Sequence, residues 1–191
     1  MKLKYMTIWF LVIWAQLLYS QQELNIVNNP EFDKGKIGWS VKAYNNAQMT
    51  FEVKTDGLLS GANYLSINIS TGGNVEDIAV YQNQSLEQGR FYSISFIASA
   101  NRDFIMHAAL IETLGDKKTF WSSPDIQLTQ VAHTFGPFNV AYYGPDAGHR
   151  LYFFLGGTDN VTVNIDAVVI TEKDDPNHFR IEEKFAQRSH T

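Results

Sequence analysis

The sequence contains no cysteine, which excludes disulfide frameworks, thiol catalysis and zinc sites built from cysteine. Charged residues are scarce, at 18% of the 191 residues, and the formal net charge is −5. With no basic cluster in the sequence, this charge excludes nucleic acid as a partner, because phosphates would be repelled. The chain does contain 45% apolar residues and 13 glycines, and it is rich in tyrosine and phenylalanine. This composition is typical of one β-rich domain with a real hydrophobic core.

The apolar run near the N-terminus is too short to cross a membrane as a helix, which needs ~20 residues. It covers residues 6–18, follows two lysines and precedes a small residue, Ser20. This arrangement is typical of a secretory signal peptide, so we expect residues 1–20 to be removed; a retained anchor is the alternative. We therefore expect a secreted or periplasmic protein that has no membrane contact after cleavage.

Residues 21–172 form the expected folded domain, because short apolar or alternating runs recur there between turn signals such as Asp56-Gly57. No window of a dozen residues has a persuasive helical period, so the pattern predicts an all-β fold, an antiparallel sandwich or barrel. The charged residues 173–191 predict a tail or linker. The expected strands are residues 39–44, 49–55, 64–69, 78–86, 91–100, 104–112, 133–139, 151–155 and 161–171.

Strand parity separates core positions from outward positions, because side chains alternate between the faces of a strand. The opposite face to the apolar one carries Tyr81, His107, Tyr152 and Phe154 instead of the usual Lys, Glu and Thr. Rings beside amide and hydroxyl groups suit sugars, whose C–H groups stack on a ring while their hydroxyls need polar partners. The alternative is that a second layer of chain covers these rings and makes them core. The predicted core rows are Tyr92, Ile94, Phe96 and Ala98; Phe104, Met106, Ala108 and Leu110; and Leu151, Phe153 and Leu155.

Catalytic motifs are missing from the sequence. There is no Gly-x-Ser-x-Gly elbow, no phosphate-binding loop and no His-Glu-x-x-His zinc motif, and the five histidines are scattered. Acidic residues such as Glu52, Asp77 and Glu112 exist, but a sequence does not give the carboxylate separation that glycoside hydrolysis requires. We therefore expect no enzymatic activity.

Several blocks of the chain resemble, in the right order, carbohydrate-binding modules of families four, nine and twenty-two. Each block is weak alone, but together they cover residues 24–171, nearly the whole expected domain. The blocks are Asn28-Asn29-Pro30-Glu31-Phe32-Asp33-Lys34-Gly35 with Gly38-Trp39, Val80-Tyr81-Gln82, residues 86–100, Arg102 with Phe104, Trp121, residues 127–135, Phe154-Leu155-Gly156-Gly157 and residues 161–168.

This resemblance implies a galactose-binding-like jelly roll, a β-sandwich of two antiparallel sheets that binds polysaccharide on one face without catalysis. The ligand would be a β-glucan, a xylan or a similar chain, held in a cleft. Ala79 stands where many relatives carry a sugar-binding glutamine, so the ligand can differ. The rings would stack on the sugar, and the other side chains would bond its hydroxyls. The expected carbohydrate-binding residues are Tyr44, Tyr81, Gln82, Asn83, Arg102, His107, Trp121 and Tyr152.

The resemblance also implies a structural calcium ion between the N-terminal loop and the last strand. Asp33 and Asp166 match the acidic positions, and carbonyls of the turn around Gly61 and Asn63 would supplement them, because calcium takes several oxygen ligands. The alternative is that Asp33 caps a turn and Asp166 makes a surface hydrogen bond.

Two other functions stay open at this point. One is a small jelly-roll enzyme that degrades polysaccharide, which would release sugar products. The other is an adhesion module whose aromatic face binds protein. We expect a monomer whose partner is a polysaccharide.

Overall fold

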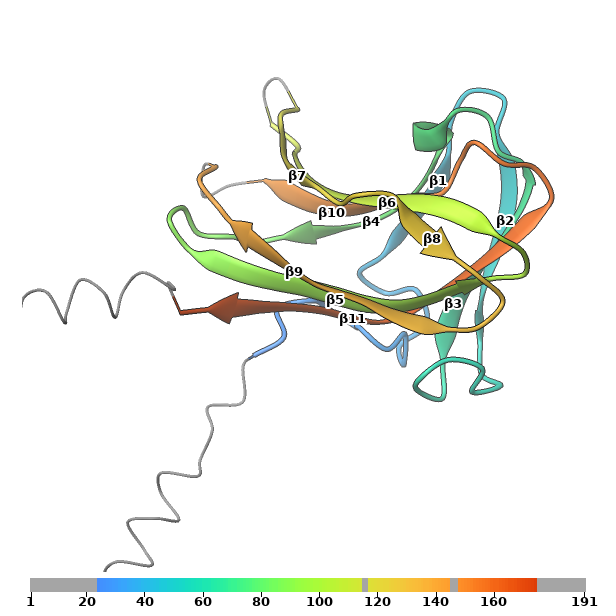
Figure 1. The fold of residues 1–191 in the computed structure, drawn as a ribbon, viewed down its shortest axis with the longest axis horizontal. Helices are drawn as coiled ribbons and strands as arrows, with labels where there is room; N and C mark the ends of the chain where they lie inside the picture. The colour runs from blue at the N-terminus through green and yellow to red at the C-terminus, as the bar shows by residue number, and fades with distance from the viewer. Residues whose placement is uncertain (1–23, 115–116, 145–147, 175–191) are drawn as a thin grey trace, which may run out of the picture.

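The computed structural model describes residues 24–114, 117–144 and 148–174, which form two antiparallel β-sheets packed face to face (Figure 1). The upper sheet of Figure 1 has the order β1 (Ser40–Ala43), β4 (Ile78–Gln84), β10 (His149–Phe154), β6 (Phe104–Glu112) and β7 (Thr119–Ser122), and β8 (Ile126–Leu128) also pairs with β6. The lower sheet has the order β2 (Gln48–Lys54), β3 (Tyr64–Thr71), β11 (Val161–Lys173), β5 (Phe91–Ala100) and β9 (His133–Ala141).

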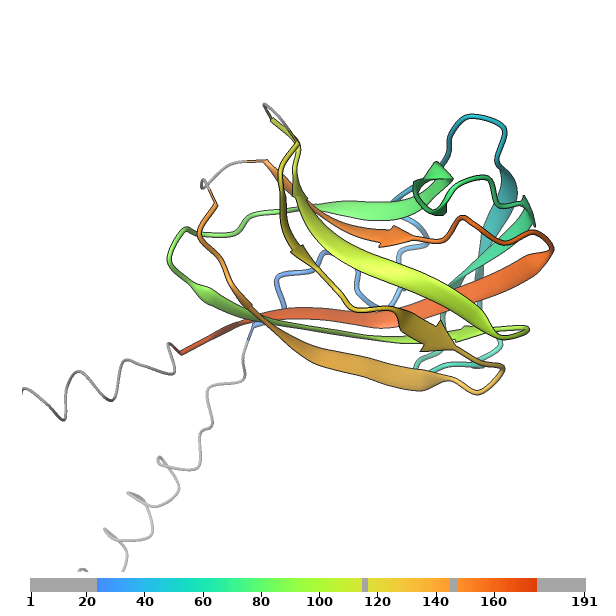
Figure 2. The same cartoon turned by 45° about the horizontal axis from the view of Figure 1, so that its top comes forward.

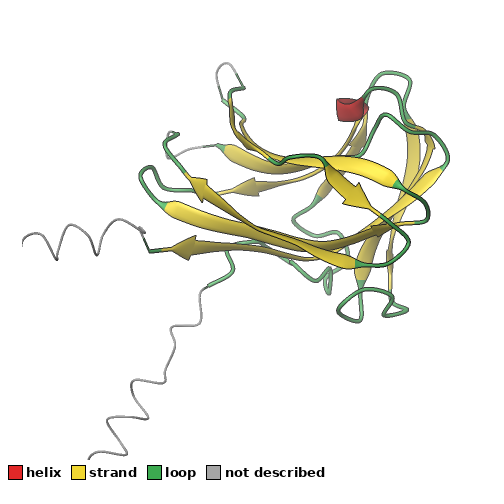
Figure 3. Cartoon of the chain, in the orientation of Figure 1, coloured by secondary structure: helices red, strands yellow, loops and turns green. Residues whose placement is uncertain are grey.

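The predicted β-sandwich jelly roll is therefore confirmed, and each of the nine expected strands is present. Two short strands, β7 and β8, were not predicted, because three or four residues are too few to show a period of two. The described residues contain a single helical turn, the 3₁₀ turn η1 (Val75–Asp77), shown red in Figure 3. The predicted signal peptide and all of the predicted tail beyond residue 174 lie outside the described residues. Within the described ranges, no helix has the length and apolar character needed to cross a membrane.

The core lies between the two sheets and contains the parity rows predicted from the sequence. Ile94, Phe96, Met106, Leu110 and Phe153 are each 0% exposed. The rings of Phe96, from β5, and Phe153, from β10, meet edge to face with centroids 4.8 Å apart, so they join the two sheets. Burying each such ring contributes ~1.5–3 kcal/mol to folding.

The two ends of the described chain meet at the lower sheet. Asn25 forms an isolated antiparallel bridge with Thr171 of β11, and the amide of Ile26 donates to the carbonyl oxygen of Ile170 at 2.9 Å. Figure 1 shows both ends leaving from this sheet. The first described residues thus fold back onto the last strand.

The outer face of the upper sheet is left open. In Figure 2, where this side comes forward, no described segment lies across β4, β10 and β6. The end of β6 and the start of β7 rise together at one end of this face, and η1 lies beside the β1–β2 loop at the other (Figures 1 and 2). Because side chains alternate, this face carries the residues of opposite parity to the core.

Candidate functional site

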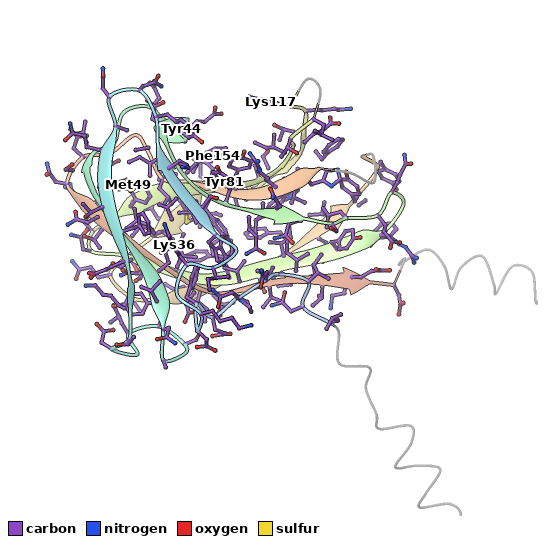
Figure 4. The ribbon with its side chains drawn as sticks, turned by 180° about the vertical axis from the view of Figure 1, so that it is seen from behind. Lys36, Tyr44, Met49, Tyr81, Lys117 and Phe154 are labelled. Carbon is purple, nitrogen blue, oxygen red and sulfur yellow. The ribbon has the colours of Figure 1, made fainter. Side chains whose placement is uncertain are left out.

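A group of stacked rings, which we call the aromatic row, lies on the open face of the upper sheet. It consists of Tyr44, Tyr81, Tyr152 and Phe154, which come from β4, β10 and the end of β1. Tyr81 and Tyr152 are register neighbours, with ring centroids 5.0 Å apart, and Tyr152 and Phe154 stack at 5.2 Å with planes inclined by 12°. Figure 4 shows Tyr44, Tyr81 and Phe154 gathered on this side. Because side chains alternate along β10, Tyr152 and Phe154 point outward while Phe153 between them points into the core.

Tyr44 leans over the row from the residue after β1. It is 46% exposed, and its hydroxyl forms a hydrogen bond with Tyr81. Partial burial, followed by the nearby hydroxyls of Tyr81 and Tyr152, raises the pKa of Tyr44 above its ordinary value. Three phenol hydroxyls therefore lie close together at one end of the row.

Arg150 sits among these hydroxyls. Its Nε donates to Oδ1 of Asn83 at 2.8 Å, and its Nη1 donates to the hydroxyl of Tyr152 at 3.3 Å. The guanidinium carbon lies 4.8 Å from the centre of the Tyr81 ring. The hydrogen bond to Tyr152 raises the pKa of Arg150, so the side chain stays charged.

A pocket of about 400 Å³ adjoins the row on its β6 side. Its floor is low because Ala109 and Ser122, register neighbours on β6 and β7, have small side chains. Phe154 and His107 stand beside this floor, as register neighbours on β10 and β6. The remaining lining residues are Val75, Glu76, Ala108, Ile111, Thr119 and Ser123.

Five of the residues predicted to bind carbohydrate lie on this face: Tyr44, Tyr81, Asn83, His107 and Tyr152. Tyr44 and Asn83 are exposed, and the other three are half-buried. His107 Nδ1 lies 3.7 Å from Oδ1 of Asp125, which gives this imidazole an acidic neighbour. The alternative prediction, that a second layer of chain covers these rings, is wrong. No described segment lies over them, and the ring side chains remain accessible.

Three residues that were predicted to bind carbohydrate do not lie on this face. The prediction fails most clearly for Gln82. Gln82 is 3% exposed. Its Nε2 donates to the carbonyl oxygen of Asn28 at 2.7 Å, and its Oε1 accepts from the amide of Asn28 at 2.7 Å. Its parity points into the sandwich, so this amide anchors the N-terminal segment and is not available to a ligand.

Trp121 and Arg102 are the other two corrections. Trp121 pairs in register with the core residue Leu110 and packs on Phe138 of β9, with centroids 5.6 Å apart, so it faces the sandwich interior. A strand as short as β7 gave no parity by which its direction could be predicted. Arg102 is exposed in the turn between β5 and β6, beyond the end of the strand that carries His107.

Two residues of the site, Arg150 and Glu76, were missed. Arg150 has the same parity as Tyr152 and Phe154 on β10, so the sequence contained a signal for it. Glu76 comes from η1, which is too short to be recognised from a sequence pattern.

The predicted calcium position lies at the far side of the sandwich, where a bulge in β11 redirects Asp166. This carboxylate is 0% exposed, and its Oδ2 accepts from the amides of Ser60 and Gly61, at 3.2 Å each, and from the Ser60 hydroxyl at 2.8 Å. Asp33 accepts a bond of 2.7 Å from the side-chain amide of Asn63. The turn 60–63 therefore connects the two predicted acidic residues.

Glu31 is a third carboxylate at this position, and it was not predicted. Burial, and then repulsion from Asp166 and Asp33, raises its pKa above the ordinary value. A Cβ built on Gly61 would lie 3.0 Å from Oε2 of Glu31 and 3.9 Å from Oδ2 of Asp166, so both carboxylates face the space that this glycine leaves free. None of the described ion pairs involves these three residues.

Glu31 and Asp166 thus offer carboxylate oxygens, the kind of donor that calcium prefers, on the space that Gly61 leaves free. Among the described residues, no three histidine, aspartate or glutamate side chains form a ready metal-binding group. Two carboxylates would thus need backbone and water ligands to complete the set.

The comparisons with known proteins give one family and one fold. The model of the carbohydrate binding domain family CBM_4_9 matches residues 24–162. A solved CBM4 structure is 22% identical, covers 77% of this chain and 99% of its own, and has a TM-score of 0.65. The second N-terminal cellulose-binding domain of Cellulomonas fimi β-1,4-glucanase C is 20% identical, covers 82% of this chain and 99% of its own, and has a TM-score of 0.61.

An enzyme shares the same fold in only part of its chain. An α-L-arabinofuranosidase is 13% identical, with a TM-score of 0.60, over 81% of this chain but only 27% of its own. A search of curated sequences finds no significant match. At these identities the structural likenesses concern the fold alone.

Proposed function

This chain belongs to the carbohydrate binding domain family, and we propose that it is a secreted, non-catalytic module that binds a polysaccharide across the open face of the upper sheet. The observation that supports this proposal is the aromatic row itself. Stacked rings there remain partly accessible to solvent, half-buried in Tyr81, Tyr152 and Phe154 and exposed in Tyr44, although a packed core lies directly beneath them. Exposed contiguous apolar surface beside polar groups is typical of a binding site.

In this proposal, the rings and the polar groups have separate roles. Tyr81, Tyr152 and Phe154 offer ring surface to the C–H faces of a sugar, while Asn83 and Arg150 bond its hydroxyls. The low floor over Ala109 and Ser122 lets the saccharide continue across the strands toward His107. We expect modest affinity, because a flexible glycan loses conformational freedom when it binds.

The absence of catalysis is also part of the proposal. Glycoside hydrolysis needs a pair of carboxyl groups that flank the scissile bond. Glu76 is the one carboxylate among the described residues that line the pocket beside the row. Release of reducing sugar or unsaturated product from any bound polysaccharide would contradict this part.

Affinity electrophoresis tests the proposal, with laminarin, xylan, mixed-linkage glucan and alginate in the gel. We expect retardation on at least one polymer and a roughly tenfold weaker effect for Tyr81→Ala, since one stacking ring contributes ~0.5–1.5 kcal/mol beyond its buried area. Tyr143→Ala is the matched control, because Tyr143 is 69% exposed and lies outside the row. Folded protein that is retarded by none of the polymers would overturn the proposal, and capture of a protein but never a glycan would favour an adhesion module.

We also propose that Glu31, Asp166 and the turn 60–63 hold a structural calcium ion. Bound to the native state alone, the ion would stabilise the fold by joining the N-terminal loop, this turn and β11. Calcium should raise the melting temperature of the wild type, and EDTA should reverse the change. Glu31→Gln should abolish the response, whereas Glu52→Gln, on an exposed strand position, should keep it. A melting temperature that is the same with calcium and with EDTA would contradict the site.

A further inference from the structure

We infer that the polysaccharide is acidic, and that Arg150 binds a carboxylate of a uronic acid unit at the Tyr81 end of the row. This inference rests on the proposed function and specifies the ligand of that site. Arg150 carries a positive charge and lies half-buried on the face to which we assign the ligand. None of the ion pairs of the described residues includes Arg150. A partly desolvated guanidinium without a counter-charge is costly, so such a group is typical of anion recognition.

The hydrogen bonds of Arg150 leave part of its donor set available. Asn83 takes the Nε proton, and the Tyr152 hydroxyl takes one proton of Nη1. A guanidinium carries five N–H donors, so three remain, and two of them suit a bidentate bond to a planar carboxylate. The stack on Tyr81 holds the guanidinium plane over that ring, which limits the orientations it can adopt.

The tyrosine hydroxyls complete an anion-binding group. The hydroxyl of Tyr152 accepts from Arg150, so its own proton points elsewhere and can be donated. Tyr44 and Tyr81 bring two more hydroxyls next to it, and their mutual hydrogen bond leaves at least one proton free. One fixed positive charge surrounded by phenol donors favours a carboxylate over a neutral hydroxyl, since charge-assisted bonds are about twice as strong.

The charge distribution along the face sets the position of this carboxylate. Glu76 lines the pocket near Phe154 and His107, and Asp125 pairs with His107, so that end carries acidic groups. Arg150 lies on β10 two residues before Tyr152, on the side away from Phe154. This side is the one toward the β6–β7 connection, where Lys117 and Lys118 are exposed. Figure 4 shows Lys117 at that end, away from Tyr44. A uronate bound at Arg150 would therefore lie on the side of the face away from Glu76 and Asp125.

The test measures binding of uronate polymers and neutral polymers to the same protein variants. The acidic probes are alginate, polygalacturonate and glucuronoxylan; the neutral probes are laminarin, unsubstituted xylan and carboxyl-reduced alginate, which keeps its backbone but has lost its charge. We expect the wild type to prefer at least one acidic probe, and its affinity to fall as salt rises from 50 to 500 mM, roughly as screening predicts.

Arg150→Gln should weaken that binding by about ten- to a hundredfold, the range for a lost bond to a charged group. Arg150→Lys keeps the charge without the planar fork and should restore only part of the affinity. Arg102→Gln removes the same charge outside the site and should bind like the wild type, and circular dichroism checks that each variant is folded.

The possible failures are distinguishable. Equal binding of alginate and its carboxyl-reduced form, or preference for neutral probes, overturns the acidic ligand but leaves the polysaccharide-binding function standing. Binding of a sulfated polymer such as carrageenan in place of uronates overturns the carboxylate assignment. Acidic binding that Arg150→Gln does not weaken overturns the role of this residue. No binding of any polymer by folded protein overturns the proposed function and this inference together.

Discussion

Replacement of Gln82 by leucine should lower stability without lowering affinity for polysaccharide. The buried amide bonds both backbone groups of Asn28 at 2.7 Å each and accepts a further bond of 3.1 Å from Nε2 of Gln84. Each such bond contributes ~1 kcal/mol, so the loss should be about 2–3 kcal/mol. In a domain of this size that lowers the melting temperature by roughly 4–12 °C. Gly38 packs against the same pair, because a Cβ built on it would lie 2.9 Å from Asn28 Nδ2.

The neighbouring amide provides the opposite case. Asn83 is exposed on the open face and accepts from Arg150, so Asn83→Leu should weaken binding of the polymer found by electrophoresis and leave the melting temperature nearly unchanged. Calorimetric melting and affinity electrophoresis of both variants complete the comparison. If Gln82→Leu lost affinity while its stability stayed at the wild-type level, the assignment of Gln82 to the interior would be refuted, along with the parity argument behind it.

Two further predictions concern the wall formed by η1. Gly156→Ala should destabilise the protein by ~1–3 kcal/mol through overpacking, because the new Cβ would lie 1.9 Å from the carbonyl oxygen of Asn74. By displacing η1 it should also weaken polysaccharide binding, and urea unfolding and affinity electrophoresis check the two effects. Gly89→Ala, whose φ of +81° strains the backbone in the β4–β5 turn, should destabilise the protein without weakening binding. The backbone amide of Asn74, followed by the side chain of Asn45, lowers the pKa of Asp77 below its ordinary 3.8. Its contribution to stability is therefore present above about pH 3.8 and lost as the pH falls through the lower folded value. Melting curves from pH 2 to 5 should show a smaller acid loss for Asp77→Asn, and an unchanged acid loss would contradict the role of these bonds.

The fold was predictable from the sequence because its long strands carry a clean alternation. β5 and β6 place apolar side chains at every second position, and all of those predicted positions are buried. Short strands and irregular segments could not be predicted from the sequence. β7 has too few residues for a period, so the direction of Trp121 was wrong, and the bulge at Asp166 breaks the parity of β11.

The candidate site was predictable only as far as parity reached. Tyr81, Asn83, Tyr152 and His107 were placed correctly on one face because they lie on regular strands. Gln82 was misplaced because it was chosen from a motif although its parity points inward. Arg150 was missed although it has the outward parity of Tyr152, because the expected strand began one residue after it. Glu31 became visible only in three dimensions, since Asp166, the carboxylate that acts most on it, is far away in sequence.

The pairing of Asn25 with Thr171 has a practical consequence for any attachment to this protein. Both ends of the described chain emerge at the lower sheet (Figure 1). The rings of the aromatic row lie on the outer side of the upper sheet. A tag, a bead or a neighbouring domain joined next to either of these ends would therefore leave the aromatic row pointing away from its support. Biosensor chips loaded through one terminus or the other should report the same apparent affinity.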